Sequence, residues 1–491
     1  MRYALFAAAL FLPFASGFFL LARPFKNETL RGRFLITVTC TVSALLLLYL
    51  MGPAVSQPFV LLSMGNHLSV AFHMDGLSRI FAGIIALLWP LAVLYSTEYM
   101  KGERNQNTFF SFYLMTYGVV IGIAFASNLF TLYLFYELLT LTTLPLVMST
   151  MTGQAKHAGK KYLTYSMSGA AAVFVGLALL LQYGDLTFAF GGCISYSAAD
   201  APILRYIFLG SFFGFGVKAA LWPVHGWLPT AGVAPTPVTA LLHAVAVVNS
   251  GVFAILRLTY YCIGTAPLSG TWVQQTVLAF SVFTILFGSA MALRYQHLKR
   301  RLAYSTISNL SYMLFGAMLM SPAGMAGALL HMIVHSVLKI VLFFCAGTLL
   351  CQTHHKGEYL FQFGGFGRKM PFTFAAFTIA SLGLIGVPPF PGYISKWAIA
   401  LAAVQDGSPL ALAGAAALCL SAFLTGLYLF GVLTPAYFPG ENDLARAIDT
   451  AGDPGWKMKT SLAVLTAFGL LLMAAAASLN DLTALVSGGL L

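Results

Sequence analysis

Long apolar runs, separated by short polar segments, occupy almost the whole chain. Each run is close to the roughly 20 residues that a helix needs to cross a bilayer. No A-x-A-like cleavage signal follows the first run, so we interpret it as a retained helix rather than a signal peptide. The runs predict fourteen transmembrane helices, at residues 2–22, 34–54, 77–97, 108–126, 128–149, 163–183, 202–222, 236–258, 273–293, 303–321, 325–351, 372–402, 409–434 and 460–478.

The composition supports an all-α polytopic membrane protein. Of 491 residues, 59% are hydrophobic and 8% charged, and the mean hydropathy is +0.85, whereas a soluble domain is about 25% charged. The net charge of +12 does not require a nucleic-acid partner, because its location can be compared with the membrane topology. The six cysteines form no C-x-x-C pair, which argues against iron–sulfur or zinc ligation in this chain.

Basic residues alternate along the chain in a way that predicts its orientation. The even-numbered connections contain only Arg205 and Arg257, both at helix ends. By the positive-inside rule the odd-numbered connections are cytoplasmic, and both termini lie on the outer side. The odd-numbered connections contain Arg23, Lys26, Arg31, Arg33, Lys101, Arg104, Lys156, Lys160, Lys161, Arg294, Lys299, Arg300, Arg301, Lys356, Arg368, Lys369, Arg446, Lys457 and Lys459.

Proline and glycine interrupt the chain at two places, LWPVHGWLPTAGVAPTPV (221–238) after the seventh helix and IGVPPFPGYISKW (385–397) within the twelfth. Paired breaks in the two halves of a transporter are typical of inverted repeats, although ordinary proline kinks are the alternative. We expect two inverted five-helix repeats, helices 4–8 and 9–13. The predicted sections are 1–107 (helices 1–3), 108–258 (first repeat), 259–434 (second repeat) and 435–491 (cytoplasmic loop and helix 14).

Several ionisable residues lie within the apolar runs. A charge at the centre of a membrane helix costs about 2.5–3.5 kcal/mol on insertion scales, so it normally faces a protein interior or a water-filled path. Glu137 is about 13–14 Å into its predicted helix by helical rise, near the middle of the membrane. The set predicts a proton or ion pathway, and its members are Glu137, Lys218, His331, His335, Lys339 and Lys396.

His331, His335 and Lys339 are spaced i, i+4, i+8, so they share one helix face over about 12 Å. Histidine changes charge near neutral pH, which suits a relay, although a single membrane histidine is more often a packing residue. For Lys396, snorkelling to the interface is the alternative to a transport role.

Several stretches resemble one family, the antiporter-like subunits shared by respiratory complex I, Mrp-type Na⁺/H⁺ antiporters and energy-converting membrane-bound hydrogenases. The resemblance covers about residues 75–400 and implies fourteen helices with helices 7 and 12 broken. The stretches are DGLSRIF (75–81), FYELLTLTTLPLV (135–147), GFGVKAALWPVHGWLP (214–229), TPVTALLHAVAVVNSGVFAILR (236–257), LKRRLAYSTISNLSYM (298–313), HMIVHSVLKIVLFFCAG (331–347), GGFGRKMP (364–371) and GVPPFPGYISKW (386–397).

The resemblance implies roles for individual residues. Glu137 and Lys218 would pair as a switch, because opening the pair favours the neutral form of each group and lets the lysine release a proton. A static buried salt bridge is the alternative. His243 matches a family histidine and would connect Lys218 to the histidine stripe, and Lys396 would be the terminal lysine from which the proton leaves.

The chain departs from the family pattern at two positions. Asn249 stands where many relatives have a lysine, and an amide can hold water but cannot carry charge. Thr230 replaces the aspartate of a WLPDA sequence that is frequent in relatives. Asp75 fits the family motif with Arg79 nearby, and a helix cap or salt bridge explains it at least as well as transport.

We find no dinucleotide-binding glycine loop in a strand–turn–helix context, no P-loop, no haem-ligand set and no self-contained active site. A tight turn suffices to explain Gly364, Gly365 and Gly367. We expect a proton-translocating subunit of a multisubunit complex in a prokaryotic inner membrane, without cofactors of its own. Partner subunits would hold iron–sulfur, flavin or nickel–iron centres, beside related antiporter-like subunits and lipids. The alternatives are a stand-alone or Mrp-type Na⁺/H⁺ antiporter and a scaffold that has lost conduction.

Overall fold

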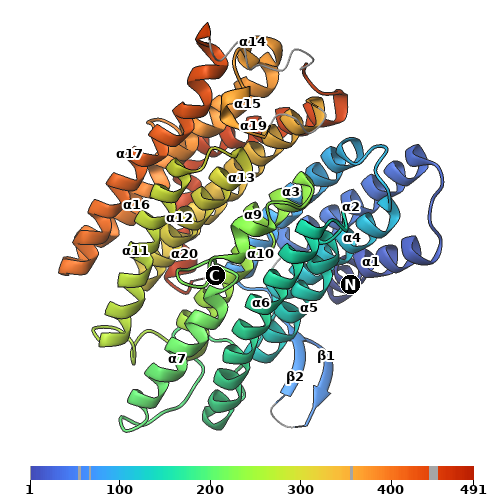
Figure 1. Ribbon diagram of the computed structural model, residues 1–491. Coiled ribbons are helices and arrows are strands. Elements are labelled where there is room, and N and C mark those ends of the chain that lie inside the picture. Colours follow the sequence, from blue (N-terminus) through green and yellow to red (C-terminus); the bar gives the residue numbers. More distant parts are fainter. Residues whose placement is uncertain (1, 53–56, 66–67, 354–357, 442–451, 491) are drawn as a thin grey trace.

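The computed structural model describes the chain except for residues 1, 53–56, 66–67, 354–357, 442–451 and 491. Long helices make up nearly all of it, and one small β-hairpin stands at an end of the bundle (Figure 1). Within the described residues, eleven helices are long and apolar enough to cross a membrane. The predicted all-α polytopic membrane class is therefore confirmed.

The first part of the chain, drawn in blue to green in Figure 1, ends with the helix pieces α9 and α10. Its elements are α1 (Arg2–Ala22), α2 (Glu28–Met51), β1 (Phe59–Met64), β2 (Leu68–Phe72), α3 (Gly76–Tyr99), α4 (Gln106–Phe125), α5 (Leu129–Val147), α6 (Gly153–Leu180), α7 (Ala201–Gly216), α8 (Trp227–Ala231), α9 (Thr236–Ala244) and α10 (Val247–Leu256), which continues as a π-helical turn (Arg257–Ile263).

The second part packs beside the first, through contacts of α13 with α9 and α3 and of α11 with α7. Its elements are α11 (Trp272–Arg294), α12 (Leu298–Met318), α13 (Pro322–Gln352), α14 (Phe366–Lys369), α15 (Pro371–Ile385), α16 (Pro391–Asp406), α17 (Pro409–Tyr437), α19 (Trp456–Ala474) and α20 (Ala476–Ser487).

The predicted spans correspond to these elements with a few differences. Predicted span 10 is α12, which has the length of a span but is not among the eleven apolar helices, and its first turn carries Lys299, Arg300 and Arg301. The β-hairpin and α20 were not predicted. The count of fourteen, the inverted repeats and the section boundaries at 107, 258 and 434 stay predictions.

Breaks interrupt the chain at both places that the sequence indicated. α7 ends at Gly216, somewhat before the predicted break, and non-helical turns lead to α8. α15 ends at Ile385 and α16 begins at Pro391. A third break was missed: the span predicted as continuous over 236–258 is divided at Val245 and Ala246 between α9 and α10. The missed break lies in an apolar stretch without proline or glycine, so no local pattern predicts it.

The connections gather at two opposite faces. The hairpin face contains the β-hairpin and the even-numbered connections, joined for example by hydrogen bonds from His73 N to Phe125 O and from Arg205 to Pro267 O. The basic face contains the odd-numbered connections, which contact one another through Lys161 and Thr230, and through Leu298 and Glu358. This arrangement agrees with the predicted alternation of connections.

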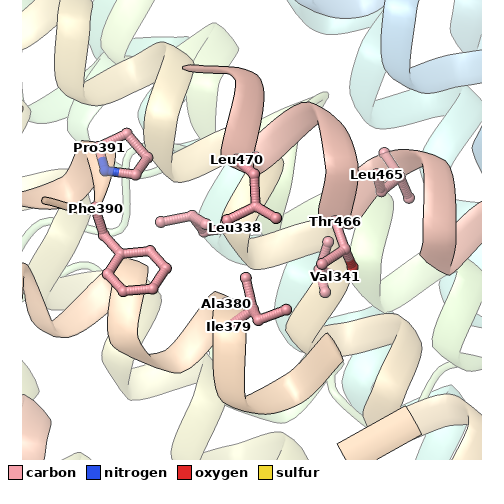
Figure 2. Close-up of a pocket in the computed structure, with 10 residues that line it drawn as sticks. Leu338, Val341, Ile379, Ala380, Phe390, Pro391, Leu465, Thr466 and Leu470 are labelled. Atoms are coloured by element: carbon pink, nitrogen blue, oxygen red, sulfur yellow. The ribbon is translucent and has the colours of Figure 1, made fainter. Parts of the chain in front are cut away.

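Helix α13 lies at the centre of the fold, and its most apolar stretch is fully buried. Ser321 is its N-cap, and Pro322 lies in its first turn. Proline is tolerated there because the backbone N–H groups of the first turn have no acceptor within the helix. Apolar packing seals it on one side: Figure 2 shows Leu338 and Val341 facing side chains of α15, α19 and the start of α16. Thr466 is the single polar side chain among the residues that line this pocket, so the charged residues of α13 lie elsewhere on the helix.

Gly251 determines how closely α10 packs against the break after α7. A Cβ atom on Gly251 would lie 2.8 Å from the carbonyl carbon of Lys218 and 3.0 Å from Cα of Ala219. We expect Gly251→Ala to lower the free energy of unfolding by about 1–3 kcal/mol, the usual cost of overpacking. Thermal unfolding of the detergent-solubilised protein measures this. Gly210→Ala on α7, where a Cβ meets no atom within 4 Å, is the matched control. Equal midpoints for the two variants would contradict the close packing.

Candidate ion-translocation site

The predicted site residues, except Glu137, are almost completely buried in the core. Their exposed fractions are 0% for Lys218, His243, His335 and Lys339, 1% for His331 and 8% for Lys396. The elements that hold them are α5, the break after α7, α9, α13 and α16. They therefore form an interior set that extends through both parts of the fold.

Lys218 lies in the non-helical turn after α7, next to α5. Its ammonium group donates a hydrogen bond to the carbonyl oxygen of Tyr136 and lies 3.5 Å from the centroid of that tyrosine ring. The ion pairs found among the described residues include neither Lys218 nor Glu137. Lys218 thus contacts the residue adjacent to Glu137, and the Glu137–Lys218 pair stays a prediction.

Glu137 faces partly outward from the bundle. It shares a side of α5 with Leu134 and Leu141, which are 36% and 58% exposed. Its Oε1 atom is buried and has no hydrogen-bonding partner in the part of the chain that the structure describes. This carboxyl group therefore lies between the interior set and the lateral surface of α5.

The unpredicted break between α9 and α10 separates His243 from Asn249. Neither ring nitrogen of His243 has a hydrogen-bonding partner among the described residues, and its ring stacks on Phe343 at 4.7 Å. The amide of Asn249 donates to Ala244 O at 2.9 Å, at the end of α9, and to Ser336 Oγ of α13 at 2.7 Å. Asn249 therefore bridges the break between α9 and α10 and joins it to α13.

The three ionisable residues of α13 lie along one face, as their spacing predicted. His331 contacts Ser395 Oγ at 2.9 Å and Asn309 Oδ1 at 3.2 Å, which joins α13 to α16 and α12. The rings of His331 and His335 are 6.2 Å apart. Neither nitrogen of His335 is hydrogen-bonded to a described residue. His331 is held by two partners, whereas His335 is free to bond to small polar molecules.

Lys339 is hydrogen-bonded to a chain of hydroxyl groups that the sequence did not predict. Its Nζ atom donates to Leu302 O at 3.1 Å and to Ser305 Oγ at 2.7 Å. Ser305 Oγ lies 2.5 Å from the hydroxyl of Tyr428, which donates to Thr425 Oγ1 at 3.3 Å. These residues come from α12 and α17 and are far apart in the sequence, so only the folded chain brings them together.

Lys396 near the start of α16 is held by the end of α15. Its Nζ atom donates to Leu384 O at 2.7 Å and to Ile385 O at 3.0 Å, two carbonyls that the break leaves without helix partners. It also lies 5.3 Å from the ring centroid of Tyr312. Since Lys396 is 8% exposed and bonds to backbone, its ammonium group faces the interior and does not snorkel to the interface.

A further buried lysine, Lys299, was assigned only to a cytoplasmic connection by the sequence. It is 7% exposed and donates to Ala234 O at 3.0 Å and Gly232 O at 3.4 Å, in the break before α9. It lines a cavity of about 1080 Å³ at the basic face, together with Tyr99, Glu103, Arg104 and residues of the α5–α6 connection. Lys299 lies one helical turn, about 4.5 Å of rise, before Leu302, whose carbonyl binds Lys339.

Asp75 and Arg257 form an ion pair at the hairpin face. The carboxylate of Asp75 caps α3 by accepting from Ser78 N at 2.9 Å, and it accepts hydrogen bonds from both terminal nitrogens of Arg257. Burial raises the pKa of Asp75, but the charge of Arg257 and the hydrogen bonds from Arg257 and Ser78 outweigh it and hold the pKa below its usual value. Asp75 is thus a helix cap and ion-pair partner, the alternative that the sequence left open.

At the other departure from the family pattern, Thr230 accepts a hydrogen bond from Lys161 at 3.1 Å. Gly365 has a φ of 72° at the start of α14, which fits the predicted tight turn. No group of three or more potential metal-binding side chains occurs in the part of the chain that the structure describes.

Buried lysines and histidines in apolar helices, some of them beside helix breaks, are typical of ion-translocating membrane proteins. Residues 126–425 match the family described as NADH:quinone oxidoreductase/Mrp antiporter, TM. Residues 61–110 match NADH-Ubiquinone oxidoreductase (complex I), chain 5 N-terminus. The chain therefore belongs to the family of antiporter-like membrane subunits of NADH:quinone oxidoreductases and Mrp antiporters, as the resemblance implied.

Individual relatives come from several complexes. NADH-quinone oxidoreductase subunit N of Desulforudis audaxviator is 32% identical over 73% of this chain and 70% of its own length. Subunit L of Mycobacterium tuberculosis is 33% identical over 76% of this chain and 58% of its own length. Hydrogenase-4 component B of Escherichia coli is 30% identical over 67% of this chain and 50% of its own length. The chain thus spans between 50% and 70% of the length of these relatives.

Two solved structures show the same fold. A chain of the archaeal membrane-bound sulfane sulfur reductase has a TM-score of 0.85 at 21% identity, covering 100% of this chain and 98% of that chain. A chain of the Mrp complex from Dietzia sp. DQ12-45-1b has a TM-score of 0.84 at 20% identity, covering 100% of this chain and 97% of that chain.

The Asp75–Arg257 pair predicts how stability changes with pH. A carboxyl group whose pKa is lower in the folded state stabilises the fold in full at pH values above its pKa in the unfolded chain, which is about 3.9 for aspartate. That contribution disappears as the pH falls through the folded value. Asp75→Asn should cost about 3–5 kcal/mol near neutral pH, because it leaves the Arg257 charge unpaired. It should also flatten the fall in thermal midpoint below about pH 4.

Unfolding midpoints measured between pH 3 and pH 7 in detergent check this expectation. Asp481→Asn, an exposed position on α20, is the control and should follow the original protein at every pH. Parallel curves for the original protein and Asp75→Asn would contradict the role of the pair.

Proposed function

We propose that this chain is a proton-translocating, antiporter-like subunit of a multisubunit energy-converting membrane complex. Its relay comprises Glu137, Lys218, His243, His331, His335, Lys339 and Lys396. Family membership supports the class of function, and the geometry of the buried lysines supports the route.

One observation carries the proposal: the ammonium groups of the relay bond to neutral oxygens. Lys218, Lys339 and Lys396 each donate to backbone carbonyls, and Lys339 also to a hydroxyl. A carboxylate partner would favour the charged form strongly, whereas carbonyl dipoles stabilise it only in part. Each lysine can therefore gain and lose a proton during turnover.

The histidines connect the lysines. Lys339 follows His331 and His335 on one face of α13, and His243 lies in the same interior on α9. Because His243 and His335 leave their ring nitrogens free of described partners, water molecules between them would complete a hydrogen-bonded path. Asn249 positions the break beside this path without carrying charge.

The cavity at the basic face is suited to proton uptake. Lys299 lines it and lies one turn from the carbonyl that binds Lys339. We propose that Lys299 takes a proton from the cavity and passes it toward Lys339. Lys396, beside the exposed Trp397, then releases the proton toward the outer side.

The outward position of Glu137 supports a neighbouring subunit. A carboxyl group at the lateral surface of the bundle has a high free-energy cost when lipid covers it, and a lower one when a polar group of a neighbouring protein does. We propose related antiporter-like subunits beside α5, lipids around them, and peripheral redox subunits with iron–sulfur, flavin or nickel–iron centres. The complex would lie in a prokaryotic inner membrane, with the basic face in the cytoplasm and both termini outside.

A Na⁺/H⁺ antiporter of the Mrp type is the second candidate. The likeness to a chain of an Mrp complex, with a TM-score of 0.84, favours it. The two candidates differ in the source of energy, since moving one charge against 100 mV requires about 2.3 kcal/mol from an ion gradient or a redox reaction.

Purification in mild detergent from native membranes, followed by mass spectrometry, distinguishes them. Co-purifying iron–sulfur, flavin or nickel–iron subunits would establish a redox-driven pump. Small membrane subunits with a longer relative and no redox subunit would establish the Mrp type. A chain that purifies alone would contradict the proposed complex.

Glu137→Gln in the assembled complex should abolish most proton translocation, about tenfold or more, because an amide cannot be ionised in the switch. A pH-sensitive dye inside proteoliposomes measures the initial rate, with the redox substrate or a sodium pulse as the driving force. Glu441→Gln, an exposed position, controls for the substitution. Wild-type rates in a correctly assembled Glu137→Gln complex would refute the relay.

Lys299→Met should slow proton uptake by a similar factor, since the long apolar chain fills the site but cannot hold a proton. The same proteoliposome assay measures this, and the difference from the original protein should be largest when the uptake side is alkaline. Lys160→Met, an exposed lysine of the basic face, is the matched control. Equal rates for the two variants would exclude uptake through Lys299.

A further inference from the structure

Two cysteines that play no part in the relay meet at the hairpin face. Cys193 belongs to the connection between α6 and α7, and Cys262 lies in the π-helical turn that ends the α9–α10 span. Cys193 lies in the sixth connection and Cys262 at the start of the eighth, and 68 residues lie between them in the sequence. The topology proposed above places both on the outer side of the membrane.

Backbone hydrogen bonds hold the two segments in register. Ala189 N donates to Tyr261 O at 3.1 Å, Gly191 N to Tyr260 O at 2.9 Å, and Cys193 N to Cys262 O at 2.9 Å. The two cysteines are thus direct neighbours across this short ladder.

A glycine allows the segments to come close. A Cβ atom on Gly192 would lie only 2.9 Å from Ile263 O and 3.1 Å from Gly264 N. The two backbones therefore approach each other closely beside Cys193.

Both cysteines are unbridged in this structure, and the backbone hydrogen bond from Cys193 N to Cys262 O at 2.9 Å brings their main chains together. Neighbouring backbones at hydrogen-bonding distance satisfy the Cα separation of about 4.4–6.8 Å that a disulfide requires. Cys193 is partly exposed and Cys262 is buried. We propose that Cys193 and Cys262 form a disulfide bond when the protein matures in its membrane.

The oxidant is a disulfide-bearing protein of the outer compartment, where disulfides persist. The Cys193 thiolate, which is the accessible one, attacks a sulfur of that disulfide and forms a mixed disulfide. The Cys262 thiolate then attacks the Cys193 sulfur and releases the oxidant as a dithiol. Two electrons and two protons pass from the two thiols to the oxidant, and one S–S bond replaces another.

The bond would fasten the α6–α7 connection to the outer end of the α9–α10 span. Arg257 of the same π-helical turn already binds Asp75 of α3, so the bond would add a second attachment at this end. It would steady the span that contains the His243–Asn249 break. This inference rests on the proposed topology and not on proton translocation.

Differential labelling of the full-length protein in native membranes tests the proposal. Acid-quenched membranes are denatured and alkylated with a light reagent, then reduced and alkylated with a heavy one, and peptides are mapped by mass spectrometry. Cys193 and Cys262 should carry the heavy label, and the other four cysteines the light one. Without reduction, one cross-linked peptide should contain both.

Matched variants complete the experiment. Cys193→Ser should transfer Cys262 to the light label, whereas Cys40→Ser, at an exposed helix position, should leave the heavy pair unchanged. Light label on both Cys193 and Cys262 in the original protein would overturn the proposal, as would a cross-link of either to another cysteine.

Discussion

The structure depends on one constraint, that a positive charge buried among apolar helices must be solvated by something. For Lys218, Lys339, Lys396 and Lys299 this is the main chain. A helix uses its own carbonyls internally, so free carbonyls occur where a helix ends or breaks. The breaks after α15 and before α9 thus supply the oxygens that hold Lys396 and Lys299.

This mode of solvation has a functional consequence. At the hairpin face, the charge of Arg257 favours the ionised form of Asp75 and holds the pKa of that carboxyl group below its usual value. Lysines bonded to carbonyls and hydroxyls lack the stabilisation of the charged form that a carboxylate partner provides. The structure thus has an ion pair at the hairpin face and, in its interior, lysines bonded to neutral oxygens, which we propose to exchange protons.

Much of the candidate site could be predicted because ionisable residues are costly, and therefore rare, within apolar membrane helices. Glu137, Lys218 and the α13 stripe stand out in apolar runs, and the i, i+4, i+8 spacing places the stripe on one face of a continuous helix. Proline and glycine marked the breaks near Lys218 and Lys396. The break between α9 and α10 had no such residues, and its stabilisation by Asn249 depends on Ser336, 87 positions away. Contacts over such separations leave no local signal.

The sequence by itself determined the polytopic class, the alternation of connections between two faces and the identity of the charges within the apolar runs, because each follows from hydropathy or local spacing. Only the tertiary structure decided which oxygens solvate each lysine, that Lys299 lines a cavity, that Glu137 faces outward, and that Cys193 meets Cys262. Those properties depend on which helices become neighbours, and packing between distant segments sets this, not the pattern within any one of them.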